Sequence, residues 1–293
     1  MLEVVLDICS GMPNPHWVLS DSQEEKFLSK VKAVTTPTLS KPSSVVPKLG
    51  YRGFIVRSSH CSGSGNSFFI HGGIVDFGQF RVNRKADNRD LERWLLDSAK
   101  SYISNSIRTE VNNELGKSSS ILQTLALDPP QPQVDCLAGQ AADAPAYNPG
   151  LWNNNPVTVS SNNCYNYANN YIDNLFAQPG YGRGGPGNLA CPDCQQNATA
   201  DGLVACNDVN NALRAGEGWY VALVINPGID YHWYRQDNTG CWSHKQGCWP
   251  VTDRDNSGNV IADPQHCDLG AYVFCTYMIR PPGVAISGGG SPC

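Results

Sequence analysis

The sequence predicts a two-domain α+β protein that contains several disulfides. Segments with apolar residues at helical spacing are mixed with segments in which apolar and polar residues alternate, as in half-buried strands. A stretch rich in proline and alanine over 117–150 indicates a linker between the two halves of the chain. The 293 residues are enough for two cores, and the 12 cysteines indicate an oxidising compartment.

Residues 1–116 are predicted to form a small α+β domain. Apolar residues alternate with polar ones over 2–8, which predicts a half-buried strand. Asp21 and Glu24 resemble a capping box at the start of an amphipathic helix. We expect this domain to be a pro-region or a module that binds a substrate or partner.

The rest of the first domain is expected to add a hairpin and a long helix. Strands over 51–57 and 67–77 form the predicted hairpin, which a loop over 61–65 would close. Asn88 is the expected N-cap of a helix over 89–115, whose apolar residues recur at helical spacing.

Residues 151–282 are predicted to form a second domain in which helices come first and an antiparallel sheet follows. One helix is expected to begin near Cys164 and a short one to lie near 207–214. Residues 283–293 are glycine-rich and should form a flexible tail. The strands of the sheet are expected over 219–225, 231–236, 241–245 and 271–278.

Cys164 is the strongest candidate for a catalytic residue. It follows four residues that favour helix N-caps, from Ser160 to Asn163. A thiol at a helix N-terminus lies near unpaired N–H groups and the positive end of the helix dipole, which favours the nucleophilic thiolate. A base is also needed, and His232, in a predicted strand, is the best candidate. A regular strand would direct Tyr231 and Trp233 to the face opposite His232.

The residues Asn163-Cys164-Tyr165-Asn166-Tyr167-Ala168, together with Tyr231-His232-Trp233-Tyr234 and His244, are similar to motifs of papain-like thiol hydrolases. Among these, the NlpC/P60 and CHAP amidases look nearest, and the resemblance covers the second domain only. It implies that Cys164 attacks a carbonyl, His232 shuttles the proton, and His244, across a hairpin turn, orients the imidazole. The implied substrate is a peptide, an amide or a peptidoglycan-like polymer.

Further residues are assigned to this expected site. Asn162 and Asn163 could donate to the oxyanion, together with the Cys164 N–H group. The aromatic residues expected to line a substrate groove are Trp152, Tyr165 and Tyr234. The residues that could orient His232 in place of His244 are Asp253, Asp255 and Asn256.

Other interpretations of the same residues stay open. Any cysteine in such a chain could be half of a disulfide, and Cys241 could bridge to Cys248. Cys191, Cys194 and Cys206 could begin a zinc site, although no second pair has the right spacing and disulfides are preferred. The loop over 253–259 resembles the first half of an EF-hand but lacks its last ligand, so a polar turn is favoured. We therefore expect no metal and no cofactor.

The sequence thus predicts a secreted cysteine-dependent hydrolase that forms a thioester. Two alternatives remain: an acyltransferase such as a transglutaminase-like enzyme, or a non-enzymatic secreted binding, toxin or matrix protein with all cysteines paired. The net charge of −5 disfavours a nucleic-acid partner, no apolar run suggests a membrane partner, and no feature indicates an oligomeric state. Asn197 lies in a glycosylation sequon. Residues 1–7 do not resemble a signal peptide, so a leader is expected to be missing or export to use another route.

Overall fold

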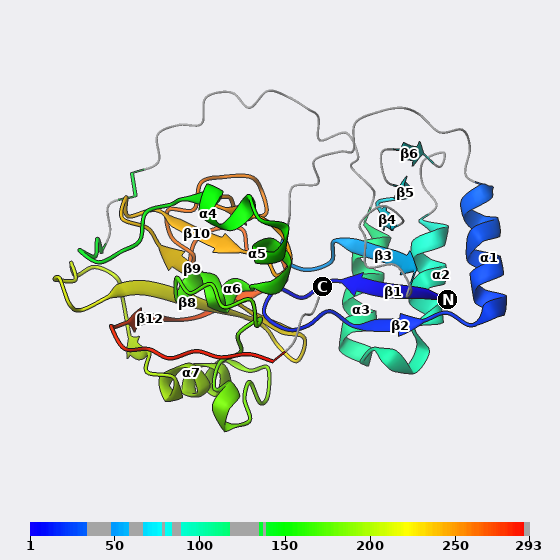
Figure 1. Ribbon diagram of the computed structural model, residues 1–293. Coiled ribbons are helices and arrows are strands. Elements are labelled where there is room, and N and C mark those ends of the chain that lie inside the picture. The colour runs from blue at the N-terminus through cyan, green and yellow to red at the C-terminus, as the bar shows by residue number, and fades with distance from the viewer. Residues whose placement is uncertain are drawn as a thin grey trace. The chain divides into compact units, whose positions relative to one another are not determined.

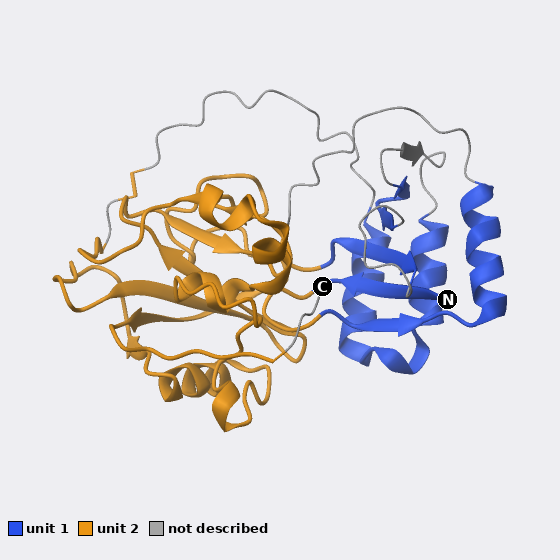
Figure 2. Ribbon diagram, in the orientation of Figure 1, with its two compact units in different colours: residues 1–8, 14–45, 51–129 blue, residues 9–13, 46–50, 130–293 orange. Residues whose placement is uncertain are grey.

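The computed structural model of the protein is a mixed α+β structure with two antiparallel sheets (Figure 1), which confirms the predicted class. It describes residues 1–33, 48–58, 67–77, 80–83, 89–117, 135–136 and 139–289. The chain divides into two compact units (Figure 2). The first unit contains residues 1–8, 14–45 and 51–129, and the second contains residues 9–13, 46–50 and 130–293. Two short segments from the N-terminal part of the sequence therefore belong to the second unit.

The first unit contains an antiparallel sheet in the order β2-β1-β3-β4-β5-β6. The predicted strands at 2–8 and 51–57 are confirmed as β1 and β3. The single strand expected over 67–77 is instead a hairpin, because Gly72 and Gly73 both adopt a positive φ and turn the chain. The predicted closing loop at 61–65 lies outside the described residues. The strands are β1 (Leu2–Asp7), β2 (His16–Val18), β3 (Gly53–Ser58), β4 (Phe68–His71), β5 (Ile74–Phe77) and β6 (Phe80–Asn83).

The helices of the first unit differ from the prediction at their ends. The helix α1 (Asp21–Lys32) begins with a capping box of Ser20 and Gln23, one residue before the predicted box. The expected long helix over 89–115 is broken, because Lys100 has a φ of 32° and Ser104 caps a new helix. The predicted cap Asn88 lies outside the described residues. The resulting pieces are α2 (Asp90–Ser98), η2 (Lys100–Tyr102) and α3 (Asn105–Gly116).

A buried glutamate holds the first unit together. Glu92 of α2 is fully buried and accepts hydrogen bonds from the Tyr51 hydroxyl at 2.7 Å and from the N–H groups of Gly72 and Gly73 at 3.1 and 2.8 Å. Three donors compensate for the burial of this carboxylate. The helix α2 is thereby fixed to the turn between β4 and β5.

The second unit contains an antiparallel sheet in the order β11-β10-β9-β8-β12-β7. All four predicted strands are confirmed, with their ends shifted by one or two residues. The strands β7 and β11 were not predicted, because runs of three and two residues carry too little pattern. The strands are β7 (Val204–Cys206), β8 (Trp219–Asn226), β9 (Asp230–Gln236), β10 (Trp242–Lys245), β11 (Val251–Thr252) and β12 (Val273–Arg280).

The helices of the second unit are short. The helix α6 begins at Cys164 as predicted, but it ends at Ala168, and Asn170 beyond it has a φ of 50°. The helix α7 was not predicted, although it has a proline in its first turn. The helix expected near 207–214 is absent, because the Asp208 side chain closes a local turn with the Asn210 N–H. The described helices are α4 (Pro149–Asn153), α5 (Pro156–Ser161), α6 (Cys164–Ala168), η3 (Tyr181–Arg183) and α7 (Cys191–Ala200).

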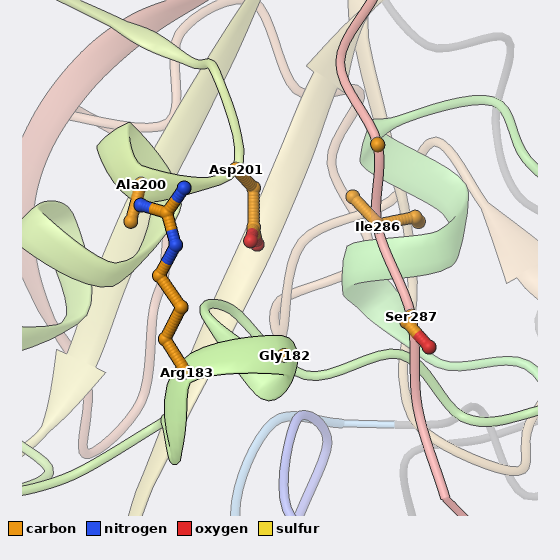
Figure 3. Close-up of a pocket in the computed structure, with 7 residues that line it drawn as sticks. Gly182, Arg183, Ala200, Asp201, Ile286 and Ser287 are labelled. Carbon is orange, nitrogen blue, oxygen red and sulfur yellow. The ribbon is translucent and has the colours of Figure 1, made fainter.

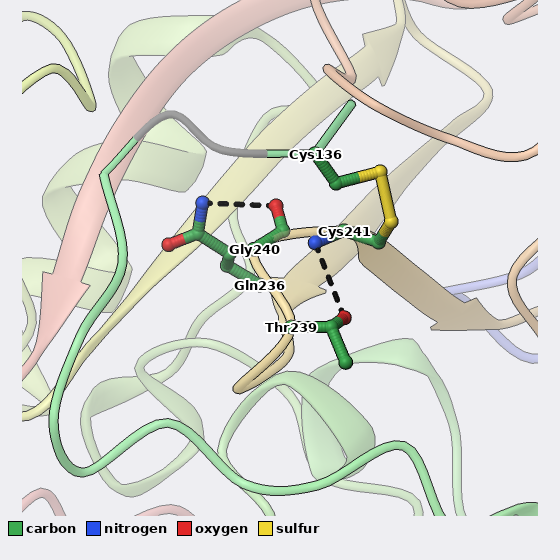
Figure 4. The surroundings of a disulfide bond; sticks show 5 residues. All are labelled: Cys136, Gln236, Thr239, Gly240 and Cys241. Carbon is green, nitrogen blue, oxygen red and sulfur yellow. Dashed lines mark hydrogen bonds between the residues drawn. A yellow bond between two sulfur atoms is a disulfide. The ribbon is translucent and has the colours of Figure 1, made fainter. Parts of the chain in front are cut away.

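Two disulfides tie outlying segments to this sheet. Cys136, in the predicted linker, is bonded to Cys241, which immediately precedes β10 (Figure 4), so Cys241 does not bridge to Cys248. Cys191 is bonded to Cys275, which joins α7 to β12 and excludes the zinc site considered for Cys191. Cys248 is disulfide-bonded as well.

The two segments predicted to lack fixed structure are partly bound to the second unit. In the predicted linker, Ala141 forms a β-bridge with Leu213. In the predicted flexible tail, Gly288 bridges to Ala177, and the Ser287 carbonyl accepts a hydrogen bond from the Gln178 N–H at 2.9 Å. Backbone pairing with distant residues thus fixes the described residues around Ala141 and Gly288.

Candidate functional site

Asn163 fixes the start of α6. Its side-chain oxygen accepts hydrogen bonds from the N–H groups of Tyr165 and Asn166, while its Nδ2 donates to the carbonyls of Gly11 at 3.0 Å and Ala177 at 2.7 Å. These bonds occupy both ends of the amide. Asn163 is therefore a structural cap, and its side chain has no free donor for the oxyanion role expected from the sequence.

Cys164 is a buried thiol. Its side chain is 0% exposed and packs in an apolar cluster with Tyr165 and Trp233. It takes part in no disulfide. Burial is the main reason why the pKa of this thiol lies well above its usual value, and the nearby charge of Asp230 raises it further. The sequence predicted a thiolate favoured by the helix N-terminus, whereas desolvation favours the neutral thiol here.

His232 and His244 lie side by side, as the sequence predicted. They face each other across the β9–β10 hairpin, with His232 Nε2 2.7 Å from His244 Nδ1. His244 Nε2 lies 2.9 Å from the carbonyl oxygen of Arg254 and must donate to it. Burial lowers the pKa of His244 to about 4, so the ring is neutral near pH 7. A neutral His244 then accepts from His232, which carries its proton on Nε2.

The histidine pair and Cys164 lie on opposite faces of the sheet. On one face, the Trp233 ring lies 5.4 Å from that of Tyr165 in α6, and Trp233 belongs to the same cluster as Cys164. On the other face, the His232 ring lies 6.4 Å from that of Tyr272, which belongs to a second cluster. Alternating side chains along β9 produce this separation. The predicted opposition of Trp233 and His232 is confirmed, and the structure does not bring Cys164 and His232 together.

The residues expected to line a substrate groove are buried as well. Trp152 packs edge-on against Tyr167 with 5.0 Å between ring centroids. Tyr165 donates its hydroxyl hydrogen to Asp201, and Tyr234 stacks on His244 at 4.7 Å. Asn162 donates to the Thr158 carbonyl and to the Asn174 side chain. Because they are buried, these side chains support the core of the unit.

The alternative orienting residues serve the loop over 253–259. Asp255 accepts hydrogen bonds from the N–H groups of Ser257, Asn259 and Asp268, which closes the loop as a polar turn. Asn256 holds the backbone of Leu49, and Asp253 pairs with Arg254 at 3.2 Å. It is the carbonyl of Arg254 that contacts His244. Over the described ranges, no group of three His, Cys, Asp or Glu side chains could hold a metal ion.

Asp230 is a buried residue that no sequence motif indicates. Its carboxylate accepts hydrogen bonds from the N–H groups of Ser10 at 2.5 Å, Gly11 at 3.1 Å and Met12 at 2.8 Å, and from the Tyr272 hydroxyl at 2.6 Å. Burial raises its pKa to about 6, although these hydrogen bonds act in the opposite direction. Asp230 thus anchors residues 10–12 within the second unit.

Gly11 shows why this anchor requires a particular sequence. A Cβ atom on Gly11 would lie 2.3 Å from the Tyr231 ring and 2.5 Å from its carbonyl oxygen. Only glycine allows the backbone to approach β9 so closely. In the sequence, a glycine followed by proline-rich residues predicts only a turn. Nothing in this local pattern predicts that the backbone of Gly11 contacts the carboxylate of Asp230.

Lys245 is a second buried charged residue with an unusual setting. Its Nζ donates to the carbonyls of Val159 at 2.5 Å and Gly247 at 2.6 Å, and no carboxylate among the described residues lies within ion-pair distance. Burial lowers its pKa to about 7. The two carbonyl contacts, one of them to α5, indicate a structural role for Lys245.

Asn197 of the sequon lies inside α7. Its Nδ2 donates to the carbonyl of Pro186 at 2.6 Å, and the following Ala198 is fully buried. In the described part of the chain, no helix has the length and hydropathy needed to cross a bilayer.

Comparison with known proteins identifies one relative. The chain is 42% identical over 130 residues to insoluble matrix shell protein 1 of Ruditapes philippinarum, an alignment that covers 43% of this chain and 82% of the relative. No protein-family profile matches the chain. No solved structure matches it either. Because the similarity extends over most of the relative, the chain belongs to the family of insoluble matrix shell protein 1.

Proposed function

We propose that this protein is a secreted, non-enzymatic component of an extracellular matrix. The observation that carries the proposal is the similarity to a protein named as an insoluble component of a shell matrix, which spans 82% of that relative. A matrix protein is one of the alternatives that the sequence allowed, although that alternative expected every cysteine to be paired. In the structure Cys164, Cys194, Cys206 and Cys267 take part in no disulfide.

The cysteines support an extracellular location. Cys136–Cys241 and Cys191–Cys275 join segments that are 105 and 84 residues apart in the sequence. Disulfides of this kind form and persist in oxidising compartments. They stabilise a folded chain outside the cell, where it has no access to the cellular machinery that refolds proteins.

The geometry of the second unit gives less support to a thiol hydrolase. In papain-like enzymes the thiol and the imidazole must come within hydrogen-bond reach of each other. Here Cys164 and His232 occupy opposite faces of the sheet, both side chains are 0% exposed, and the pKa of the thiol is raised by burial. The papain-like resemblance also implies a helix followed by an antiparallel sheet, and that order is present in the second unit. A shared order of elements supports a proposal about common ancestry, but it gives little support to a shared activity.

Fractionation of the secreted matrix tests the proposal. An antibody raised against the recombinant protein would be used on cells, medium and detergent-extracted extracellular matrix of the organism that produces it. We expect the protein in the matrix residue that resists extraction. Detection in the cytosol alone would refute the proposal. As a parallel control, the native protein and a Cys164→Ala variant should be equally inactive on peptide and amide substrates.

A further inference from the structure

The second unit contains an open cleft that none of the roles above uses. It lies between η3, the C-terminal end of α7 and residues 285–287, and its volume is about 280 Å³ (Figure 3). Two charged side chains of opposite sign line it, Arg183 and Asp201, together with the apolar side chains of Ala200 and Ile286. A cleft with a few polar groups beside apolar walls is typical of small-ligand sites.

Asp201 lines this cleft, and its two carboxylate oxygens differ in their hydrogen bonds. Its Oδ2 accepts hydrogen bonds from the Tyr165 hydroxyl at 2.9 Å and from the Gly180 N–H at 2.8 Å. No donor in the part of the chain that the structure describes reaches Oδ1. The two bonds to Oδ2 fix the orientation of the carboxylate, so Oδ1 is a positioned acceptor for a hydroxyl or N–H group of a ligand.

Arg183 supplies the complementary donors. Its side chain is exposed, and within the described ranges its guanidinium makes no hydrogen bond or ion pair, Asp201 included. The loop that carries it is well defined, because Gly180 and Gly184 adopt φ values of 68° and 88° and the Arg183 N–H donates to the Gly180 carbonyl at 2.8 Å. Figure 3 shows the Asp201 carboxylate between the side chains of Arg183 and Ile286.

We propose that this cleft binds one sugar ring of a neutral polysaccharide. A ligand that satisfies both charged groups must offer a donor to Asp201 and an acceptor to Arg183, and a sugar ring offers both through its hydroxyl or acetamido groups. The opposite charges leave the cleft without net charge, which suits a neutral ligand better than an anion. The C–H groups on one face of the ring would pack on Ile286, and 280 Å³ accommodates about one ring.

The exposure of the cleft indicates that the ligand is a polymer. A single ring held by an exposed arginine and a half-buried aspartate binds weakly, because each hydrogen bond competes with water. A polysaccharide presents the same ring many times, which raises its effective concentration around the cleft. That such a polymer is present around the protein rests on the proposed matrix function. The geometry of Arg183 and Asp201 does not depend on that proposal.

Titration with defined oligosaccharides tests the inference on the full chain. The probes are the β-1,4-linked hexamer of N-acetylglucosamine, the corresponding glucose hexamer, and glycylglycine as a zwitterion of similar size. Calorimetry or chemical-shift changes would be measured for the native protein, for Arg183→Gln and for Arg214→Gln. Arg214 is an exposed arginine of the same unit that does not line the cleft, so it provides the matched control.

We expect at least one hexamer to bind the native protein and the Arg214→Gln variant equally. Arg183→Gln should weaken binding by about tenfold, the loss typical of removing a hydrogen bond from a charged group, with an unchanged Tm. Failure of both hexamers to bind, equal binding by Arg183→Gln, or a preference for glycylglycine would overturn the inference. A protein that still partitions into the insoluble matrix in those cases would leave the proposed function standing.

Discussion

Replacement of Asp230 by alanine should loosen the second unit at a defined place. The carboxylate accepts from three consecutive N–H groups, those of Ser10, Gly11 and Met12, and from the Tyr272 hydroxyl. Alanine would leave these donors without an acceptor in a region where Ser10 and Asp230 are both 0% exposed. We therefore expect residues 9–13 to detach from β9.

The magnitude follows from the number of donors. Each buried donor that loses its acceptor costs about 1–3 kcal/mol, and the carboxylate itself is costly to bury. Water that enters the vacated space would satisfy some of the donors. The net loss of unfolding free energy for Asp230→Ala should therefore be about 3–5 kcal/mol, as for other buried hydrogen-bonded charges that lose a partner. Asp230→Asn keeps one acceptor oxygen and should cost about 2 kcal/mol.

Hydrogen exchange and urea unfolding would measure both aspects. The amides of residues 10–12 should be protected in the native protein and exchange much faster in Asp230→Ala. Urea unfolding, followed by tryptophan fluorescence, would give the loss in stability. Asp135→Ala is the matched control, because Asp135 is exposed in the same unit. A loss below about 1 kcal/mol with residues 10–12 still protected would refute the assigned anchoring role of Asp230.

Three further predictions concern the thiol, the histidine pair and a disulfide. Iodoacetamide should leave Cys164 unlabelled in the native protein and label it after denaturation, and rapid native labelling would contradict its burial. The folded-state pKa of His244, about 4, lies below the usual 6.5, so the folded state binds fewer protons and loses stability as pH falls through this window. The difference in unfolding free energy between the native protein and His244→Gln should therefore fall by up to about 3 kcal/mol between pH 7 and 4. A difference that stays constant over this range would show that the ring is not buried in neutral form. Cys136→Ser should lower the free energy of unfolding by about 2–5 kcal/mol, since the disulfide closes a loop of 105 residues. The control Cys206→Ser should change the urea midpoint little. Equal midpoints for the two variants would indicate that the disulfide does not form.

Strong local patterns in the sequence predicted much of the fold. The strands β1, β8 and β9 are long runs of apolar or alternating residues, and they formed where expected. The breaks were harder to predict. The run over 89–115 has helical spacing throughout, yet the structure interrupts it before Ser104. Serine is a good N-cap residue, but serines also occur within helices, so Ser104 alone did not predict a break.

The pairing of His232 with His244 was also predictable, because it depends on one hairpin. Their strands are joined by a short turn, and antiparallel pairing across it sets which residues are neighbours. The surroundings of Asp230 were not predictable in this way. Its donors come from residues 10–12, 218 to 220 positions away in the chain, and no local pattern encodes such a contact.

The sequence alone established the class of fold, the start of α6 at Cys164 and the neighbourhood of the two histidines, because propensity, capping and hairpin register act over short distances. Tertiary structure decided which face of the sheet α6 covers, and with it the separation of Cys164 from His232. It also determined that Cys164 is buried as a thiol. Both outcomes depend on how apolar surfaces from distant segments pack together, and that free energy is a property of the whole unit.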